Sequence, residues 1–335
     1  MPAAPPRYAE LHALSAFSFR RSVAQPGDLV KQAAELGYTA VAITDECSMA
    51  GVVRAYEAAR ECRLKLIIGT EIHLVGGLHL ILLAPSQTAY SQLCRLITRA
   101  RRRATKGHYR VEPADLKDNL DAVLAIWKPE PWTDSAADPP HALADELKAC
   151  FGPRLRLGAT RRLQPGERLW FRDLERFASH HDLRCLACGD VRMVRREQRA
   201  LLDVMTALRE SKPIPECGLA LKANGECHLR PRATLERIYP QAWLEETLDL
   251  AEQCRFSLSE LNYRYPRELV PAPLTPAQHL RQLTLAGMRE RYGEQVPDQV
   301  RKLIAHELKL IEEMGVEAFF LTVHDAVRFA RSRGI

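Results

Sequence analysis

Two hydrophobic patterns alternate along the first two-thirds of the chain. Short apolar runs rich in branched residues predict buried strands, at 8–12, 39–44, 64–75, 78–84, 122–127, 154–158 and 184–188. Amphipathic stretches between them predict helices, as in PGDLVKQAAELG, where Pro26 and Gly27 open the helix and Gly37 closes it. About seven strand and helix units favour an α/β fold, a distorted TIM-like βα barrel, over an open doubly wound sheet.

The pattern changes after about residue 215. The segment SKPIPECGLALKANGECHLR is punctuated by Pro and Gly and is typical of a connector. Strand signals then disappear, and helical periodicity predicts helices at about 231–240, 242–254, 275–292, 297–314 and 320–333. We therefore expect a barrel domain over 1–215, a connector over 216–274 and a mostly helical segment over 275–335.

Charge and cysteine content narrow the class of protein. The formal charge of +6 is compatible with a polyanionic partner and is also common among soluble proteins. The nine cysteines are scattered and odd in number, which indicates reduced thiols and a cytoplasmic location. The lone CxxC, Cys185 to Cys188, lacks a second ligand pair at zinc-finger spacing. Since long apolar runs are absent from the sequence, membrane insertion is not expected.

Polar residues of metal-binding type lie at the ends of the predicted strands. In a βα barrel, such residues meet around one mouth of the barrel. Imidazoles and carboxylates in this arrangement favour a divalent cluster that activates water for phosphoester hydrolysis. The alternative for each residue is a capping or hydrogen-bonded core group. The candidate ligands are His12, Asp45, Glu46, Glu71, His79 and Asp190.

The motifs that carry these residues resemble a known family. ELHALSAFS, AITDECSMAGV, LIIGTEI, LHLILLA and CGDVRM occur in the order and spacing of the polymerase and histidinol phosphatase (PHP) domain. That domain is a distorted barrel with a multi-metal site, found in bacterial DnaE-type DNA polymerases. The resemblance extends along the chain and is strongest to the error-prone branch of the DNA polymerase III alpha family, the ImuC branch. It implies damage-induced translesion DNA synthesis.

The ligand set departs from that of metal-binding PHP enzymes. Leu14 stands where they have a second His, Glu46 where they have a His after the Asp, and Arg192 where they have a His after the last Asp. Leucine cannot ligate, and a permanent cation at Arg192 opposes a divalent ion beside Asp190. We therefore expect a degenerate site that at most retains one weakly held Mn or Zn ion, and a barrel whose main role is structural.

The resemblance also implies what the parent protein does and what this chain lacks. A DnaE-type palm performs Mg²⁺-dependent nucleotidyl transfer on a DNA primer-template with dNTPs. Residues 275–335 resemble the start of that palm and stop before its catalytic aspartates, so the chain alone is expected to be inactive as a polymerase. A sliding clamp and other damage-response polymerase subunits are expected partners. The alternative is a stand-alone PHP-type metal-dependent phosphoesterase or 3′-5′ exonuclease.

Overall fold

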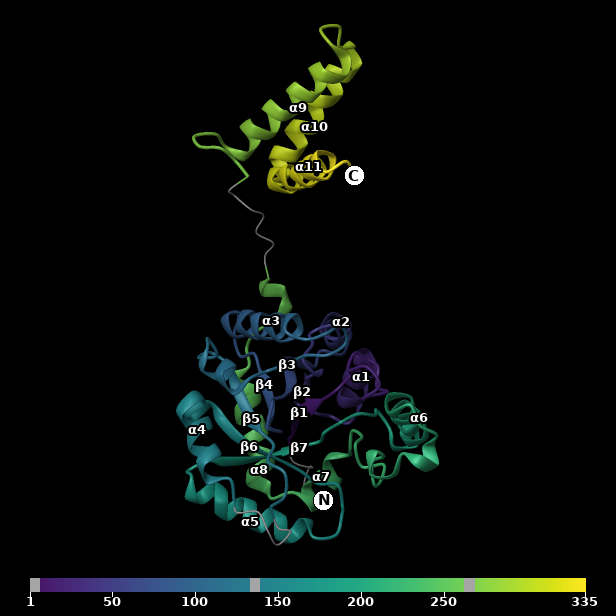
Figure 1. Ribbon diagram of the computed structural model, residues 1–335, viewed down its shortest axis with the longest axis vertical. Helices are drawn as coiled ribbons and strands as arrows, with labels where there is room; N and C mark the ends of the chain where they lie inside the picture. Colours follow the sequence, from purple (N-terminus) through teal and green to yellow (C-terminus); the bar gives the residue numbers. More distant parts are fainter. Residues whose placement is uncertain (1–6, 133–138, 262–268) are drawn as a thin grey trace. The chain divides into compact units, whose positions relative to one another are not determined.

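A computed structural model describes residues 7–132, 139–261 and 269–335 (Figure 1). The chain divides into two compact units, Met1–Leu261 and Asn262–Ile335. The first holds all of the described strands, and the second is helical.

The strands of the first unit form one mixed sheet in sequential order, β1 to β7. Neighbouring strands are parallel from β1 to β3 and from β5 to β7, whereas β4 is antiparallel to both of its neighbours. Backbone hydrogen bonds between Val191, just after β7, and both His12 and Leu14 of the first strand segment bring the two sheet edges together. The strands are β1 (Ala9–Ala13), β2 (Ala40–Ile43), β3 (Lys65–His73), β4 (His79–Leu83), β5 (Leu124–Trp127), β6 (Leu155–Thr160) and β7 (Arg184–Cys188).

This nearly closed, distorted barrel confirms the predicted fold class. The main distortion is the reversed direction of β4, which forms a hairpin with β3. The sequence pattern had predicted repeated parallel units here. Only five residues, 74–78, join β3 to β4, which is too short for the crossover helix that a parallel connection needs. Gly76 and Gly77 both have positive φ, at 95° and 88°, which glycine adopts without steric cost.

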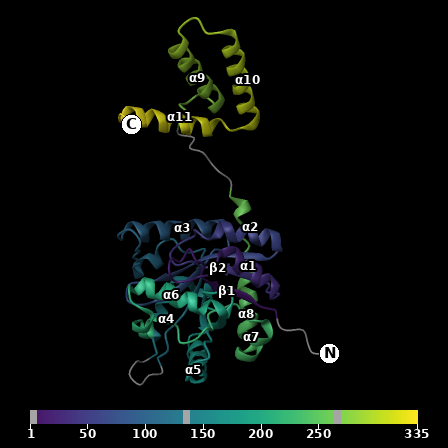
Figure 2. The same ribbon diagram turned by 90° about the vertical axis from the view of Figure 1, so that its right-hand side faces the viewer.

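Helices cover the outside of the sheet (Figures 1 and 2). Alternate residues of a strand face opposite sides, so Val41 and Ile43 join the large cluster beneath the helices while Ala40 and Ala42 join a second buried cluster. The helices of this layer are α1 (Pro26–Glu35), α2 (Val52–Cys62), α3 (Gln87–Arg102), α4 (His141–Phe151) and α5 (Glu167–His180). Helix α6 (Arg199–Glu210) instead buries Leu202 in a separate small cluster with Val23, Met193 and Cys227.

The second cluster is completed by a helix from the segment that we expected to be a connector. Helix α8 (Gln241–Gln253) packs on β7 and β1, and Leu250 and Ala251 are buried among the strand residues of that cluster. The preceding helix α7 (Arg232–Ile238) buries Leu235 in the large cluster. The segment 216–261 therefore belongs to the compact barrel unit, although its sequence carries connector signals.

The second unit contains α9 (Pro276–Tyr292), α10 (Asp298–Met314) and α11 (Glu317–Ser332), close to the predicted helices (Figure 2). A capping box starts α9: the backbone N–H of Gln278 donates to Thr275 Oγ1 at 3.2 Å, and the backbone N–H of Thr275 donates to Gln278 Oε1 at 3.0 Å. None of the helices in the described ranges combines the length and apolar character that a membrane span requires.

Candidate functional site at the barrel mouth

Three histidines converge on the carboxylate of Glu71. His12 Nε2 lies 2.5 Å from Glu71 Oε2, His79 Nε2 lies 3.5 Å from the same oxygen, and His73 Nε2 lies 2.8 Å from Oε1. Lys128 Nζ is 3.5 Å from His12 Nδ1. Because an ammonium group only donates, Nδ1 of His12 accepts, and the ring proton on Nε2 is donated to Glu71.

The protonation states of this group follow from burial. Burial lowers the pKa of both His12 and His79 to about 4, so both imidazoles are neutral at pH 7. Burial would raise the pKa of Glu71, but the hydrogen bonds of His12 and His73, the close approach of His79 and the charge of Arg192 hold it well below its ordinary value. At neutral pH the group is a buried carboxylate that accepts hydrogen bonds from His12 and His73, with the neutral ring of His79 close by.

Asp190 is contacted by four cationic side chains, each from a different strand end or loop. Arg192 donates to Oδ1 from Nε at 3.0 Å and Nη2 at 2.9 Å, and Arg162 forms an ion pair with Oδ2. Lys128 Nζ and Lys222 Nζ lie 3.7 Å and 3.8 Å from Oδ2. Burial opposes ionisation of Asp190, yet these cations, led by Arg192, hold its pKa well below the ordinary range.

The pKa of Lys222 reflects the high density of positive charge around Asp190. The carboxylate of Asp190 favours the charged amine, but burial and the guanidinium groups of Arg192 and Arg162 oppose it and lower the pKa of Lys222 to about 8. The same Asp190 carboxylate raises the pKa of Arg162. The single carboxylate of Asp190 therefore cannot neutralise the four cationic side chains that contact it.

The remaining two candidates, Asp45 and Glu46, hold the loops around the mouth in place. Asp45 accepts three hydrogen bonds of 2.7 Å, from the backbone N–H and hydroxyl of Ser15 and from the hydroxyl of Ser18. Glu46 forms an ion pair with Arg21 and accepts a 2.8 Å hydrogen bond from the Tyr109 hydroxyl. Both carboxylates are already engaged by groups of the protein.

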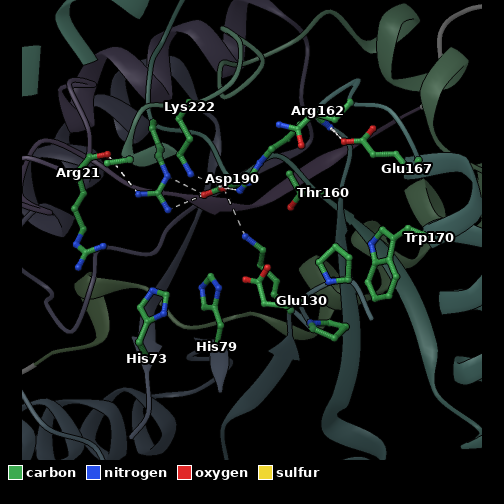
Figure 3. A pocket seen from close by; sticks show the side chains of 18 of the residues that line it. Arg21, His73, His79, Glu130, Thr160, Arg162, Glu167, Trp170, Asp190 and Lys222 are labelled. Atoms are coloured by element: carbon green, nitrogen blue, oxygen red, sulfur yellow. Dashed lines mark hydrogen bonds and ion pairs between the residues drawn. The ribbon is translucent and has the colours of Figure 1, made fainter. Parts of the chain in front are cut away.

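A cavity of about 590 Å³ opens beside these groups (Figure 3). Figure 3 shows Arg21, Arg162, Lys222, His73 and His79 around it, with Asp190 at the centre of a network of ion pairs. Three carboxylates line the cavity, Glu130, Glu167 and Asp190. The cationic lining residues are Arg21, Lys128, Arg162, Arg192, Arg209 and Lys222.

The donor set fits one metal ion but not a cluster. Ligand atoms of His12, Glu71 and His79 lie within 4.8 Å of one another, and His79 Nε2 is buried without a hydrogen-bond partner in the described part of the chain. A second ion would need Asp190, which Arg192, Arg162, Lys128 and Lys222 surround. Bridged two-metal chemistry requires both ions to be held a few Å apart, and these cations oppose that arrangement.

Of the six candidates, the structure brings together His12, Glu71 and His79, and it places the others in separate networks. Their assignment as metal ligands remains a prediction. His73 and Lys128 also belong to the site and were not predicted, although the same rules point to them: His73 lies two residues from Glu71 on one strand face, and Lys128 directly follows β5. Lys222 was not predicted either, because it lies in the segment expected to be a connector, and its local sequence does not indicate that the chain returns to the barrel mouth there.

A second group of possible metal ligands lies away from the mouth, at α4 and the end of α5. His141, His180 and His181 have ring nitrogens within 4.8 Å of one another. His141 Nδ1 and His181 Nε2 are 2.7 Å apart, and His181 Nδ1 is 3.1 Å from Asp145 Oδ1. The described residues therefore offer two candidate places for a metal ion measured on this chain.

Comparison with known proteins places the chain among polymerase relatives. Residues 10–149 match the PHP domain family, and residues 278–335 match the bacterial DNA polymerase III alpha NTPase domain family. The chain is 52% identical over 98% of its length to the error-prone DNA polymerase of Pseudomonas paraeruginosa and 50% identical, over 98%, to that of Methylococcus capsulatus. It spans about 31% of the length of each of these relatives.

A solved structure that resembles the fold is an amidohydrolase from Chromobacterium violaceum, with a TM-score of 0.44 and 15% identity. The match covers 56% of this chain and 88% of the amidohydrolase. At this level of similarity we draw nothing from that enzyme's chemistry. The informative matches are those to the two domain families and to the error-prone DNA polymerases that align with 98% of this chain.

Proposed function

Because this chain belongs to the PHP-containing family of error-prone DNA polymerases, we propose that it forms the barrel and the first helices of the palm in a DNA-directed DNA polymerase. The whole protein would extend primers past damaged template bases, using DNA and dNTPs as substrates. Its palm would hold the Mg²⁺ ions of nucleotidyl transfer beyond the residues present here. The PHP barrel of this chain would brace that machinery without hydrolysing phosphoesters itself.

One observation carries the non-hydrolytic assignment of the barrel. Arg192 places two guanidinium nitrogens within 3.0 Å of Asp190 Oδ1, at the strand end where a cluster would need an unpaired carboxylate. A guanidinium is always charged at physiological pH and cannot be displaced by deprotonation. This argues against the stand-alone phosphoesterase or exonuclease, which needs a metal cluster to activate water.

The second unit supports the palm assignment through its exposed apolar surface. Among its described residues, only a few large hydrophobic side chains are buried, Leu280, Val296 and Leu321. A longer series on α10 and α11 is exposed: Leu303, Leu310, Met314, Phe319, Phe320, Val323, Val327 and Phe329. Helices with this much exposed apolar area are typical of an element that packs against further protein. The domain limits and the clamp and other subunits as partners remain proposals.

Primer extension tests the proposed function. We expect the full polymerase to extend a primer across an abasic site with Mg²⁺ and dNTPs, and the 335-residue chain to give no extension. The same chain should not degrade a 3′ end or hydrolyse a phosphomonoester in Mn²⁺ or Zn²⁺. A full-length protein that fails to extend any primer, or metal-dependent hydrolysis by this chain, would overturn the proposal.

A further inference from the structure

The mouth cavity carries more positive than negative charge. Six cationic side chains and three carboxylates line it. At its centre, Lys128, Arg162, Arg192 and Lys222 surround two buried carboxylates, Asp190 and, through Arg192 Nη2 at 3.8 Å, Glu71. Four cationic side chains therefore face two carboxylates. An excess of buried positive charge is costly unless a further anion balances it.

The arrangement presents these cations, not the carboxylate, to an incoming ligand. The Asp190 side chain is fully buried, whereas the side chains of Arg162 and Lys222 are 31% and 30% exposed. Both line the cavity, and both lie beside Asp190 in Figure 3. Among the groups around Asp190, an anion that enters therefore meets the guanidinium of Arg162 and the ammonium of Lys222 first.

Among the described residues of the cavity lining, two besides His79 have a buried donor group without a hydrogen-bond partner. The hydroxyl oxygen of Thr160 and Nε of Arg162 are buried and make no hydrogen bond in the described part of the chain. Thr160 ends β6, and Figure 3 shows it beside Asp190 and below Arg162. A buried polar group without a partner is uncommon, and a bound oxyanion would satisfy the donors of both residues.

The loops that carry the two exposed cations are tied together. Asn224 Nδ2 donates to the backbone oxygen of Arg162 at 2.5 Å, and the guanidinium of Arg199 donates to the backbone oxygen of Lys222. These hydrogen bonds fix the positions of the loop after β6 and the loop before α7 relative to each other. Donors that are already positioned lose less entropy on binding.

We propose that this cavity binds a phosphate-type oxyanion without a metal ion, with Arg162, Lys222 and Thr160 as the contacting residues. Lys128 and Arg192 lie behind them and contribute charge. Guanidinium and ammonium groups form short, charge-assisted hydrogen bonds with phosphate oxygens, and the volume of about 590 Å³ leaves room for a group attached to the phosphate. The inference rests on the proposed function in one respect, that the barrel does not hydrolyse its ligand.

The phosphate has two possible sources, a small free anion or the terminal phosphate of a nucleic-acid chain. Calorimetric titration in EDTA separates them, with inorganic phosphate and pyrophosphate in one arm and 5′-phosphorylated and 5′-hydroxyl oligonucleotides in the other. We expect saturable binding that weakens with salt. Preference for the phosphorylated over the hydroxyl oligonucleotide would identify a chain terminus, and binding of pyrophosphate alone would identify a free anion.

Matched variants assign the site. Arg162→Gln and Lys222→Gln should each weaken binding by about tenfold or more, because each removes a charge-assisted contact. Lys31→Gln is the control, since Lys31 is a 56% exposed cation on α1 away from the cavity lining. Asp190→Asn should tighten binding, because it removes the central negative charge. If that variant does not fold, the first two variants decide the question.

The proposal fails if the chain shows no saturable binding in EDTA, or if binding appears only after Mn²⁺ or Zn²⁺ is added. It also fails if Arg162→Gln and Lys222→Gln both bind as the unmodified chain does. None of these outcomes bears on primer extension by the full polymerase. Failure of the anion site and failure of the proposed function are therefore distinguishable.

Discussion

Arg192 and Asp190 form a buried ion pair in which two guanidinium nitrogens contact one carboxylate oxygen, at 3.0 Å and 2.9 Å. The two residues are separated by one position in CGDVRM, at the end of the last strand of the barrel. Arg192 also lies 3.8 Å from Glu71, so a single cation joins the two carboxylates that a metal cluster would share. Under the proposed assignment, the guanidinium of Arg192 holds the carboxylate that a second divalent ion would need.

Removal of this cation should destabilise the barrel. Arg192→Gln leaves Asp190 buried without its main partner, although Arg162, Lys128 and Lys222 still neutralise part of its charge. We expect a loss of about 2 to 4 kcal/mol in the free energy of unfolding, measured by urea denaturation. Arg172→Gln, at a 56% exposed arginine paired with Asp173, is the control and should cost less than about 0.5 kcal/mol. Equal stability of the two variants would contradict the structural role of Arg192.

Glu10 should give the barrel a distinct pH dependence. Burial raises the pKa of Glu10 from 4.5 to about 7, against hydrogen bonds from the Gly189 and His12 N–H groups and the Tyr8 hydroxyl. Between these values the carboxyl ionises in the unfolded state but stays protonated in the folded state. Rising pH therefore favours unfolding, by up to about 3 kcal/mol once both values are passed.

Glu10→Gln removes this titration while keeping an acceptor oxygen. Relative to the unmodified chain, the Glu10→Gln variant should therefore become more stable as the pH rises from 4.5 to about 7.5. Urea denaturation across this range measures the difference in unfolding free energy, in which contributions from the histidines cancel. The exposed Glu35 on α1 supplies the control variant, Glu35→Gln. A difference that stays constant with pH would show that Glu10 is ionised in the folded barrel.

Gly51 allows the loop of Asp45 to close. A Cβ at Gly51 would lie 2.5 Å from Asp45 Oδ2 and 2.7 Å from the Ser15 hydroxyl, so Gly51→Ala must displace that hydrogen-bonded group. We expect a loss of about 1 to 3 kcal/mol. Gly27→Ala is the matched control, because its Cβ would meet only Ala58 Cβ at an ordinary 3.7 Å, in a helix that favours alanine. If thermal unfolding ranks the two variants in the reverse order, the packing described around Asp45 is wrong.

Much of the barrel could be predicted from sequence because its signals are local. The strands, the helices α9 to α11 and the convergence of His12, Glu71 and His79 follow from periodicity and from the rule that strand ends meet at one mouth. The reversal of β4 was missed, although Gly76 and Gly77 mark a hairpin. The contacts of Lys222 with Asp190, and of α8 with β1 and β7, join segments far apart in sequence, and only tertiary packing brings them together.

The helical unit should be the less stable part of this chain. Its described residues bury few large side chains, and its exposed apolar residues on α10 and α11 gain nothing from folding alone. Amide hydrogen exchange should therefore be at least about 100-fold faster in α9 to α11 than in β1 to β7. Comparable protection in both parts would contradict the proposal that these helices need further protein to pack against.

The number of metal ions bound at the barrel mouth tests the central claim most directly. The chain would be stripped with EDTA, reconstituted with Mn²⁺ or Zn²⁺ and counted by mass spectrometry, with and without His141→Ala to remove the second histidine group. We predict at most one ion per chain at the mouth, unchanged by Asp190→Asn, and no phosphomonoester hydrolysis. Two or more ions that are lost on Asp190→Asn, together with hydrolytic turnover, would show that the metal cluster is intact.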